Sequence, residues 1–229
     1  MTTTVAPPLY RTSIGRKVLM AGSGIILIGF VVAHMIGNLK VFLGAGPYNR
    51  YADFLRRMGE PIAPRSVLLW IIRVVLIAAF IVHVTFAVLT ARQSRAARTV
   101  RYVKTDVVQA DAAAKTMRWG GLAILLFLFF HLANFTWGWI HPGYVFIRGD
   151  VYHNMVKNFD IVWIDAVYIA AMIALGLHMY HGTWSVFQTF GANSRRWDTA
   201  IRRGATTLAV IIVVGNCSMP IAVLSGAVK

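Results

Sequence analysis

The chain has 229 residues, of which 58% are hydrophobic and 14% are charged, and its mean hydropathy is +0.63. Its apolar residues fall in runs long enough to cross a bilayer, which takes about 20 residues of helix. The composition excludes an ordinary soluble globule and predicts one integral membrane domain over residues 1–229. The N-terminal stretch lacks the layout of a cleaved signal peptide, because its first apolar run is too long for one.

The net charge is +15, from 23 Lys and Arg against 8 Asp and Glu. The basic residues gather at the ends of the apolar runs, where they orient a membrane protein and contact anionic lipid. This interpretation is favoured over binding of nucleic acid, and we expect no nucleic-acid partner. The single cysteine, Cys217, excludes an intrachain disulfide and a four-cysteine iron–sulfur cluster, and no C-x-x-C-H motif is present for covalent haem attachment.

Five apolar runs predict a bundle of five transmembrane helices, so the fold class is an all-α membrane protein. The predicted spans cover about residues 18–39, 66–91, 119–140, 160–187 and 205–224. Residues 40–65 form a polar connection with room for a short surface helix, 92–118 form the most basic connection, and 141–159 form a polar loop. The fifth span is expected to break near Pro220.

The positive-inside rule predicts the orientation of the five spans. With the N-terminus in the cytoplasm, the inner segments carry fourteen Lys and Arg residues and the outer segments carry eight, with Arg73 left out because it lies within a span. We therefore expect a multi-pass protein of the cell membrane with a cytoplasmic N-terminus.

Four histidines lie inside the apolar runs, one in each of the first four spans: His34, His83, His131 and His178. Ionisable residues inside a membrane usually mark a functional site, and neutral imidazole is a common axial ligand of haem iron. A helix rises 1.5 Å per residue, which places His34 and His131 in the outer half of the membrane and His83 and His178 in the inner half. The sequence therefore predicts two b-type haems, each held between two histidines.

Several alternatives remain open at this stage. A single intramembrane histidine is often only hydrogen-bonded to a neighbouring helix, and His181 lies one turn from His178, so either could be a ligand by spacing alone. His141 and His153 fall in the outer loop and are expected to be solvated. Arg73 either extends its charge to the nearby interface or pairs with a haem propionate or a quinone.

The order of these features resembles the cytochrome b subunit of succinate dehydrogenases and fumarate reductases, in its single-chain, two-haem form. His34 and Asn38 form the H-x-x-x-N of the first span, and Phe130 precedes His131. In the family's pattern the fourth-span ligand stands four residues before the Gly of a G-x-W-S stretch and thirteen before a second Gly. Gly182 and Gly191 fit His178 on that spacing and do not fit His181, which remains unplaced, as does the loop 141–159.

The resemblance implies a membrane anchor for a flavoprotein subunit and an iron–sulfur subunit. Electrons from succinate would enter at the inner haem and leave near the outer haem toward a quinone, usually menaquinone in two-haem members. The chain would belong to a succinate dehydrogenase complex of the respiratory chain and the tricarboxylic acid cycle without itself touching succinate. One alternative is a quinone-linked dihaem cytochrome b that anchors a hydrogenase or another dehydrogenase. Another is a haem-free membrane protein with histidines in a proton path.

Overall fold

The computed structural model describes residues 8–97 and 112–229, and this part of the chain is helical with no strand. The helices are α1 (Ser13–Asn38), α2 (Ala45–Arg57), α3 (Val67–Ala96), α4 (Ala112–His131), α5 (Val151–Phe159), α6 (Val162–Thr189) and α7 (Asp198–Leu224). Short 3-10 turns lie at Leu9–Arg11 and Leu39–Leu43, and a π-helical turn at Leu132–Thr136 follows α4. The all-α class is confirmed.

Five helices are long and apolar enough to cross a membrane, which confirms the predicted number of spans. They cover Ser13–Leu43, Val67–Ala96, Met117–Thr136, Val162–Thr189 and Asp198–Leu224. Their outward faces carry large apolar side chains, and Trp70, Ile77 and Ile81 of α3 are each more than half exposed. A face of this kind needs an apolar solvent, so by length and composition these are the helices of a multi-pass membrane protein.

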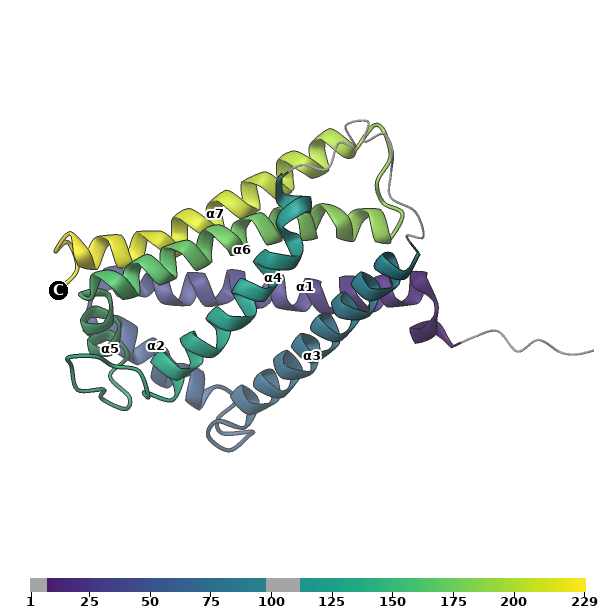
Figure 1. The fold of residues 1–229 in the computed structure, drawn as a ribbon. Coiled ribbons are helices and arrows are strands. Elements are labelled where there is room, and N and C mark those ends of the chain that lie inside the picture. Colours follow the sequence, from purple (N-terminus) through teal and green to yellow (C-terminus); the bar gives the residue numbers. More distant parts are fainter. Residues whose placement is uncertain (1–7, 98–111) are drawn as a thin grey trace, which may run out of the picture.

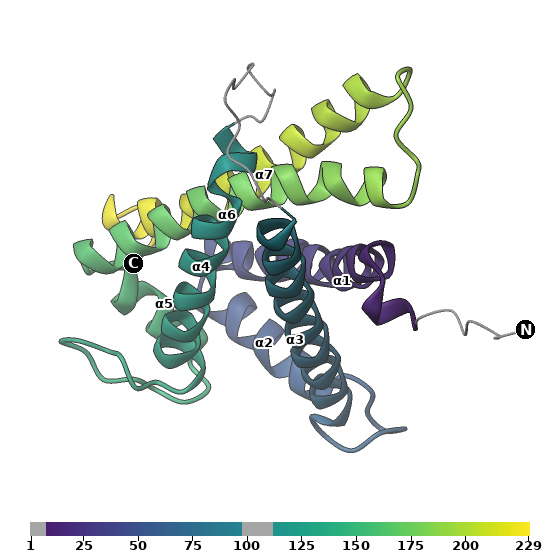
Figure 2. The ribbon, with the colours of Figure 1, turned by 45° about the vertical axis from the view of Figure 1, so that its right-hand side comes forward.

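Helix α6 is the centre of the bundle, because it packs against α7, α4 and α1, while α1 also packs along α3 (Figure 1). Helices α3 and α4 run obliquely to the group formed by α1, α6 and α7, as a second view shows (Figure 2). In the described part of the chain, α1 does not pack closely along α4, nor α3 along α6. Contact within each of these two pairs of helices therefore depends on long side chains rather than on close backbones.

The two ends of the bundle differ. Helices α2 and α5 lie at one end, close to the C-terminus, and we call this the α2–α5 end (Figure 1). The start of α1, the end of α3 and the start of α7 lie at the opposite end, which we call the N-terminal end. The Arg16 guanidinium at the start of α1 donates a 3.3 Å hydrogen bond to Gln93 Oε1 near the end of α3. Sequence-distant ends of two spans are thus joined there.

The helix boundaries differ from the predicted ones in several places, and the second span, for example, ends at Ala96 rather than 91. Helix α1 begins at Ser13 rather than near residue 18, because the Thr12 side chain caps it by accepting a 3.0 Å hydrogen bond from the Gly15 N–H. The third span ends at Thr136 rather than 140, because the chain turns at Gly138 with φ of 66°. The fifth begins at Asp198 instead of residue 205.

Two further expectations are wrong. Residues 141–159 are not entirely loop, because α5 forms over Val151–Phe159 with the Asp150 carboxylate as its N-cap. Helix α7 is not broken at Pro220 and continues to Leu224. A proline removes one backbone hydrogen bond, and Pro220 is fully buried, so packing outweighs that loss here. The short helix expected between the first two spans is confirmed as α2. Much of the basic connection 92–118, including residues 98–111, lies outside the described residues.

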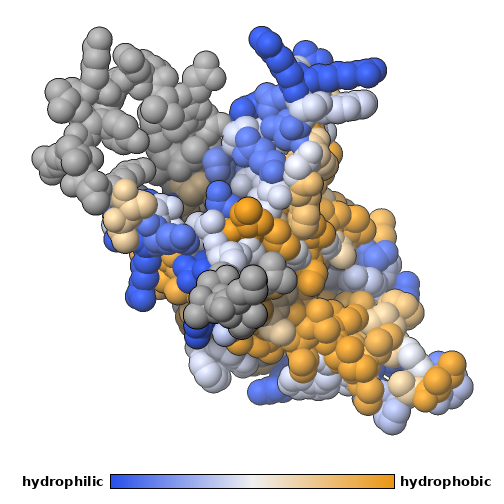
Figure 3. All heavy atoms as spheres, turned by 90° about the vertical axis from the view of Figure 1, so that its right-hand side faces the viewer, coloured by the Kyte–Doolittle hydropathy of each residue, from blue (hydrophilic) through white to orange (hydrophobic). Residues whose placement is uncertain are grey.

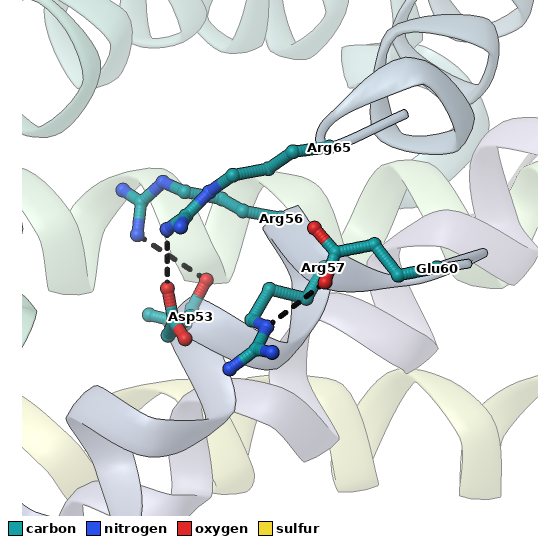
Figure 4. A network of polar contacts seen from close by, with 6 residues as sticks. Asp53, Arg56, Arg57, Glu60 and Arg65 are labelled. Atoms are coloured by element: carbon teal, nitrogen blue, oxygen red, sulfur yellow. Dashed lines mark hydrogen bonds and ion pairs between the residues drawn. The ribbon is translucent and has the colours of Figure 1, made fainter. Parts of the chain in front are cut away.

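Exposed ion pairs join α2 to the connection that precedes α3 (Figure 4). Arg65 pairs with Asp53, and Arg57 Nε lies 3.1 Å from Glu60 Oε2. The Arg56 guanidinium donates to the Ala52 carbonyl instead. Exposed pairs of this kind each contribute about 0–1 kcal/mol, so they shape this connection more than they stabilise the bundle.

Candidate functional site

The imidazoles of His34 and His131 face each other between α1 and α4. Their ring centroids lie 5.9 Å apart and their planes are at 90°. Phe30 stacks on His34 with centroids 5.1 Å apart, and Phe127 and Phe135 lie 5.8 and 5.7 Å from His131. Aromatic rings thus fix both imidazoles in position, and we call them the outer pair.

The imidazoles of His83 and His178 make a second such contact between α3 and α6, which we call the inner pair. Their centroids lie 6.2 Å apart and their planes are at 65°. His83 Nδ1 lies 3.1 Å from the Met20 carbonyl oxygen on α1. A carbonyl oxygen only accepts hydrogen bonds, so this contact requires a proton on His83 Nδ1 and leaves Nε2 with a free lone pair. Among the described residues, no partner lies within hydrogen-bond distance of the buried Nδ1 of His178.

The two pairs lie at different levels of the bundle. His34 stands in the last turns of α1, toward the α2–α5 end, and His83 lies in the second half of α3, toward the N-terminal end. These are the same two pairs that the helix rise predicts. Although all four residues lie within spans, His34 is exposed and the other three are half-buried.

The spacing within each pair suits two ligands of one metal ion. An imidazole nitrogen binds a metal at about 2 Å, and the ring centroid lies about 1 Å behind that nitrogen, so two imidazoles across one ion have centroids about 6 Å apart. The observed 5.9 and 6.2 Å match this value. An edge-to-face contact between two rings also falls within about 4.5–7 Å. The spacing of one pair alone is therefore compatible with metal ligation and with a simple ring contact. Its repetition at two levels of the bundle favours ligation.

The two histidines of each pair fit a metal ion whose other ligands come from a cofactor. Within the described ranges, no three or more His, Cys, Asp and Glu side chains are grouped to hold a bare metal ion. A structural zinc site takes four protein ligands, whereas haem iron needs only one or two axial ligands from the protein. Two histidines on separate helices are the donor set of a bis-histidine haem, so the residues present fit that group.

The remaining predicted residues make other contacts. The His181 ring lies 5.8 Å from Trp184 in an edge-to-face contact, so the ring facing His83 belongs to His178. Arg73 is exposed on α3, with its guanidinium 4.8 Å from the centre of the Trp70 ring. His141 Nδ1 and His153 Nε2 contact carbonyl oxygens of the loop before α5, at 2.9 and 3.1 Å.

A buried polar cluster beside the outer pair was not expected from the sequence. Asn134, Asn158 and Asp165 are each at most 2% exposed, and Tyr168 is 6% exposed. Tyr168 links the cluster to the outer pair, since its hydroxyl lies 3.2 Å from His131 Nδ1. One signal was available: Asn134 is an amide within an apolar run, three residues after a candidate ligand, and buried polar groups nearly always have partners.

Comparison with known proteins does not identify a family for this chain. No family model, no curated protein and no solved structure matches the chain. Its function is therefore inferred from the residues and their geometry.

Proposed function

We propose that this chain is the cytochrome b membrane-anchor subunit of a succinate:quinone oxidoreductase, with one haem b at each histidine pair. The observation that supports the proposal most directly is the repeated contact between imidazoles of different helices, at 5.9 Å in the outer pair and 6.2 Å in the inner pair. Four helices each contribute one ring, and the donor set of each pair is that of a bis-histidine haem.

In this proposal the protein residues hold each haem in position and keep oxygen from binding its iron. His34 with His131, and His83 with His178, would each hold one haem iron from both sides and leave no place for oxygen, which favours electron transfer over ligand chemistry. When bound, the two haems carry electrons between the iron–sulfur partner and a quinone, of which menaquinone is the expected kind. The helices hold the four rings at fixed heights, so the electron path crosses the bundle from the N-terminal end to the α2–α5 end.

The N-terminal end is the proposed docking face for the hydrophilic partners. Arg92 and Arg95 end α3, and Arg202 and Arg203 lie in the first turns of α7, near the basic start of α1. Figure 3 views this end, where hydrophilic residues gather beside an apolar flank. A positively charged end is expected to face the cytoplasm, and the flavoprotein and iron–sulfur subunits would bind there.

The first experiment is a reduced-minus-oxidised absorption spectrum of the purified chain with its partners, together with a haem count. A b-type spectrum with about two haems per chain is expected. A complex that contains no haem would reject the proposal. Replacing His83 or His178 by Ala is expected to remove the inner haem and to leave the outer one.

Subunit identification separates this function from the nearest alternative. A succinate dehydrogenase flavoprotein and an iron–sulfur protein should copurify with the chain, and succinate should reduce both haems. If a hydrogenase or a formate dehydrogenase copurifies instead, the two-haem anchor remains but its enzyme is different. Reduction of menaquinone rather than ubiquinone by succinate then tests the expected quinone.

A further inference from the structure

Three residues of the polar cluster, Tyr168, Asn134 and Asn158, form one continuous hydrogen-bonded chain with His131. It runs from His131 through Tyr168 and Asn134 to Asn158, and joins the π-helical turn after α4 to α5 and α6. Asn134 and Asn158 are fully buried, so no solvent hydrogen bond competes with these contacts. The direction of each hydrogen bond then follows from which atoms can donate and which can only accept.

The orientation of the Asn134 amide is determined by a backbone carbonyl. Its Nδ2 donates one hydrogen bond to the Ile140 carbonyl oxygen, at 2.6 Å, and one to Asn158 Oδ1, at 2.7 Å. A carbonyl oxygen only accepts, so the amide cannot be turned around without placing two oxygens in contact. Both donors of Asn134 are used, and its Oδ1 is left as an acceptor.

Asn158 is oriented in the same way. Its Oδ1 accepts from Asn134 and also lies 3.5 Å from the Tyr144 hydroxyl, which donates to it. Tyr144 lies in the loop before α5, and burial raises its pKa to about 12, so its hydroxyl keeps its proton at neutral pH. Turning Asn158 around would bring its amide nitrogen against that of Asn134, with two donors facing each other.

The Tyr168 hydroxyl has one proton, and Asn134 takes it. The hydroxyl donates to Asn134 Oδ1 over 2.8 Å. Toward His131 Nδ1, 3.2 Å away, it therefore presents a lone pair. If the tyrosine proton pointed at His131 instead, the oxygens of Tyr168 and Asn134 would face each other unshielded at 2.8 Å in a buried site, which is costly.

We infer that Asn134 and Tyr168 are positioning residues that hold His131 in the tautomer with its proton on Nδ1. The Nε2 lone pair is then free to bind iron. The hydrogen bond from Nδ1–H to the Tyr168 oxygen also makes Nε2 a stronger electron donor to the metal. This inference deepens the proposed function and rests on it for the part that concerns haem. The Met20 carbonyl does the same for His83 in the inner pair, so each pair has one ring of fixed tautomer.

The variant that tests the inference is Tyr168→Phe. Its ring is packed against Phe127, Phe130, Phe135 and Phe159, with centroids 4.9–6.0 Å away, and phenylalanine keeps that packing. Loss of the hydroxyl removes the acceptor of the Nδ1 proton, so iron(III) at the outer pair is stabilised less. We expect the midpoint potential of the outer haem to rise, that of the inner haem to stay unchanged, and the affinity for the outer haem to fall about 10–100-fold.

Tyr152→Phe is the matched control. It removes a hydroxyl that donates 2.8 Å to the backbone oxygen of Lys229 at the same end of the bundle. Both haem potentials should keep their wild-type values in this variant. If Tyr168→Phe retains both haems and the midpoint potential of its outer haem equals the wild-type value, the inference is overturned.

A second measurement does not depend on haem. Nitrogen-15 NMR of histidine-labelled protein reports which ring nitrogen of His131 carries the proton, and we expect Nδ1 in the wild-type chain. A proton on Nε2 overturns the inference whether or not Tyr168→Phe folds. Absence of any haem spectrum rejects the proposed function instead, and the tautomer measurement still decides the role of Tyr168.

Discussion

Gly24 of α1 lies directly against the His83 imidazole of α3. A Cβ atom at position 24 would stand 3.4 Å from His83 Cε1, which is ordinary contact, so only a hydrogen atom separates this backbone from the ring at present. The His83 ring also contacts the carbonyl oxygen of Met20, which lies on α1 one turn before Gly24. The backbone of α1 therefore packs against the His83 ring of the inner pair.

A large side chain at position 24 should displace His83. We expect Gly24→Leu to remove the inner haem and leave the outer one, measured by haem count and by the reduced spectrum. Gly22→Leu is the control, because a Cβ atom at position 22 would have no neighbouring atom within 4 Å. Retention of both haems in Gly24→Leu would contradict the role given to His83.

The outer pair should respond independently of the inner pair. Replacing His34 or His131 by Ala is expected to remove only the outer haem, because each removes one of its two axial ligands. His141→Ala and His153→Ala are the matched controls, since both side chains contact loop carbonyls instead. The haem count of each variant decides the assignment, and loss of a haem in either control would place one of its ligands outside the five spans.

The close approach of α6 and α7 at Gly176 should be sensitive to a single methyl group. A Cβ atom there would overlap with Val213 Cγ2. We expect Gly176→Ala to lower the free energy of unfolding by about 1–3 kcal/mol through overpacking. Gly182→Ala on the same helix has open space around it and should raise stability by about 0.5–1 kcal/mol. Unfolding in detergent, followed by circular dichroism, measures both; equal effects would show that the two helices are not in close contact.

The Asp150 cap of α5 should make stability depend on pH. The His153 backbone N–H, at 2.9 Å, and the Asn49 side-chain amide, at 3.0 Å, hold the pKa of the Asp150 carboxyl below its usual value. Because the pKa is lower in the folded state, this stabilisation is complete above the unfolded pKa of about 4 and is lost as pH falls through the folded value.

Asp150→Ala should therefore reduce stability at neutral pH by about 0.5–2 kcal/mol, the usual effect of losing an N-cap. Its difference from wild type should shrink as the pH falls below about 4, where the wild-type carboxyl takes up a proton. Asp150→Asn keeps a capping oxygen without a titrating group, so its own stability should lack this acid transition. Melting temperatures between neutral and acid pH measure all three chains, and a pH-independent difference for Asp150→Ala would exclude the carboxylate as the cap.

Two buried polar residues of the cluster should differ sharply in their effect on stability. Asn134→Ala removes the acceptor of the Tyr168 hydroxyl proton and the amide that donates to Asn158 Oδ1 and to the Ile140 carbonyl, and each group left unsatisfied costs about 1–3 kcal/mol. Neither carboxylate oxygen of Asp165 has a hydrogen-bond partner among the described residues. Asp165→Asn should therefore leave the melting temperature unchanged or raise it, and a strong loss would show that Asp165 has a partner of its own.

The sequence by itself determined the helices and the heights of their histidines. Runs of apolar residues must form helices in lipid, because a membrane offers no other partner for backbone polar groups, and a constant rise per residue converts position along the chain into depth. This was sufficient for five spans and for pairing His34 with His131 and His83 with His178 as candidate ligands. It missed α5, whose nine residues begin at a cap that only local hydrogen bonds reveal.

Only the tertiary structure decided which way each ring faces. Height along a helix does not fix the direction of a side chain around the axis relative to a neighbouring helix, and this direction depends on contacts between residues far apart in the sequence. For that reason spacing left His178 and His181 as alternatives, while the arrangement of α3 and α6 around α1 brings His178 to His83 and leaves His181 against Trp184. The link from His131 through Tyr168 to Asn134 likewise exists only once α4 and α6 are packed together.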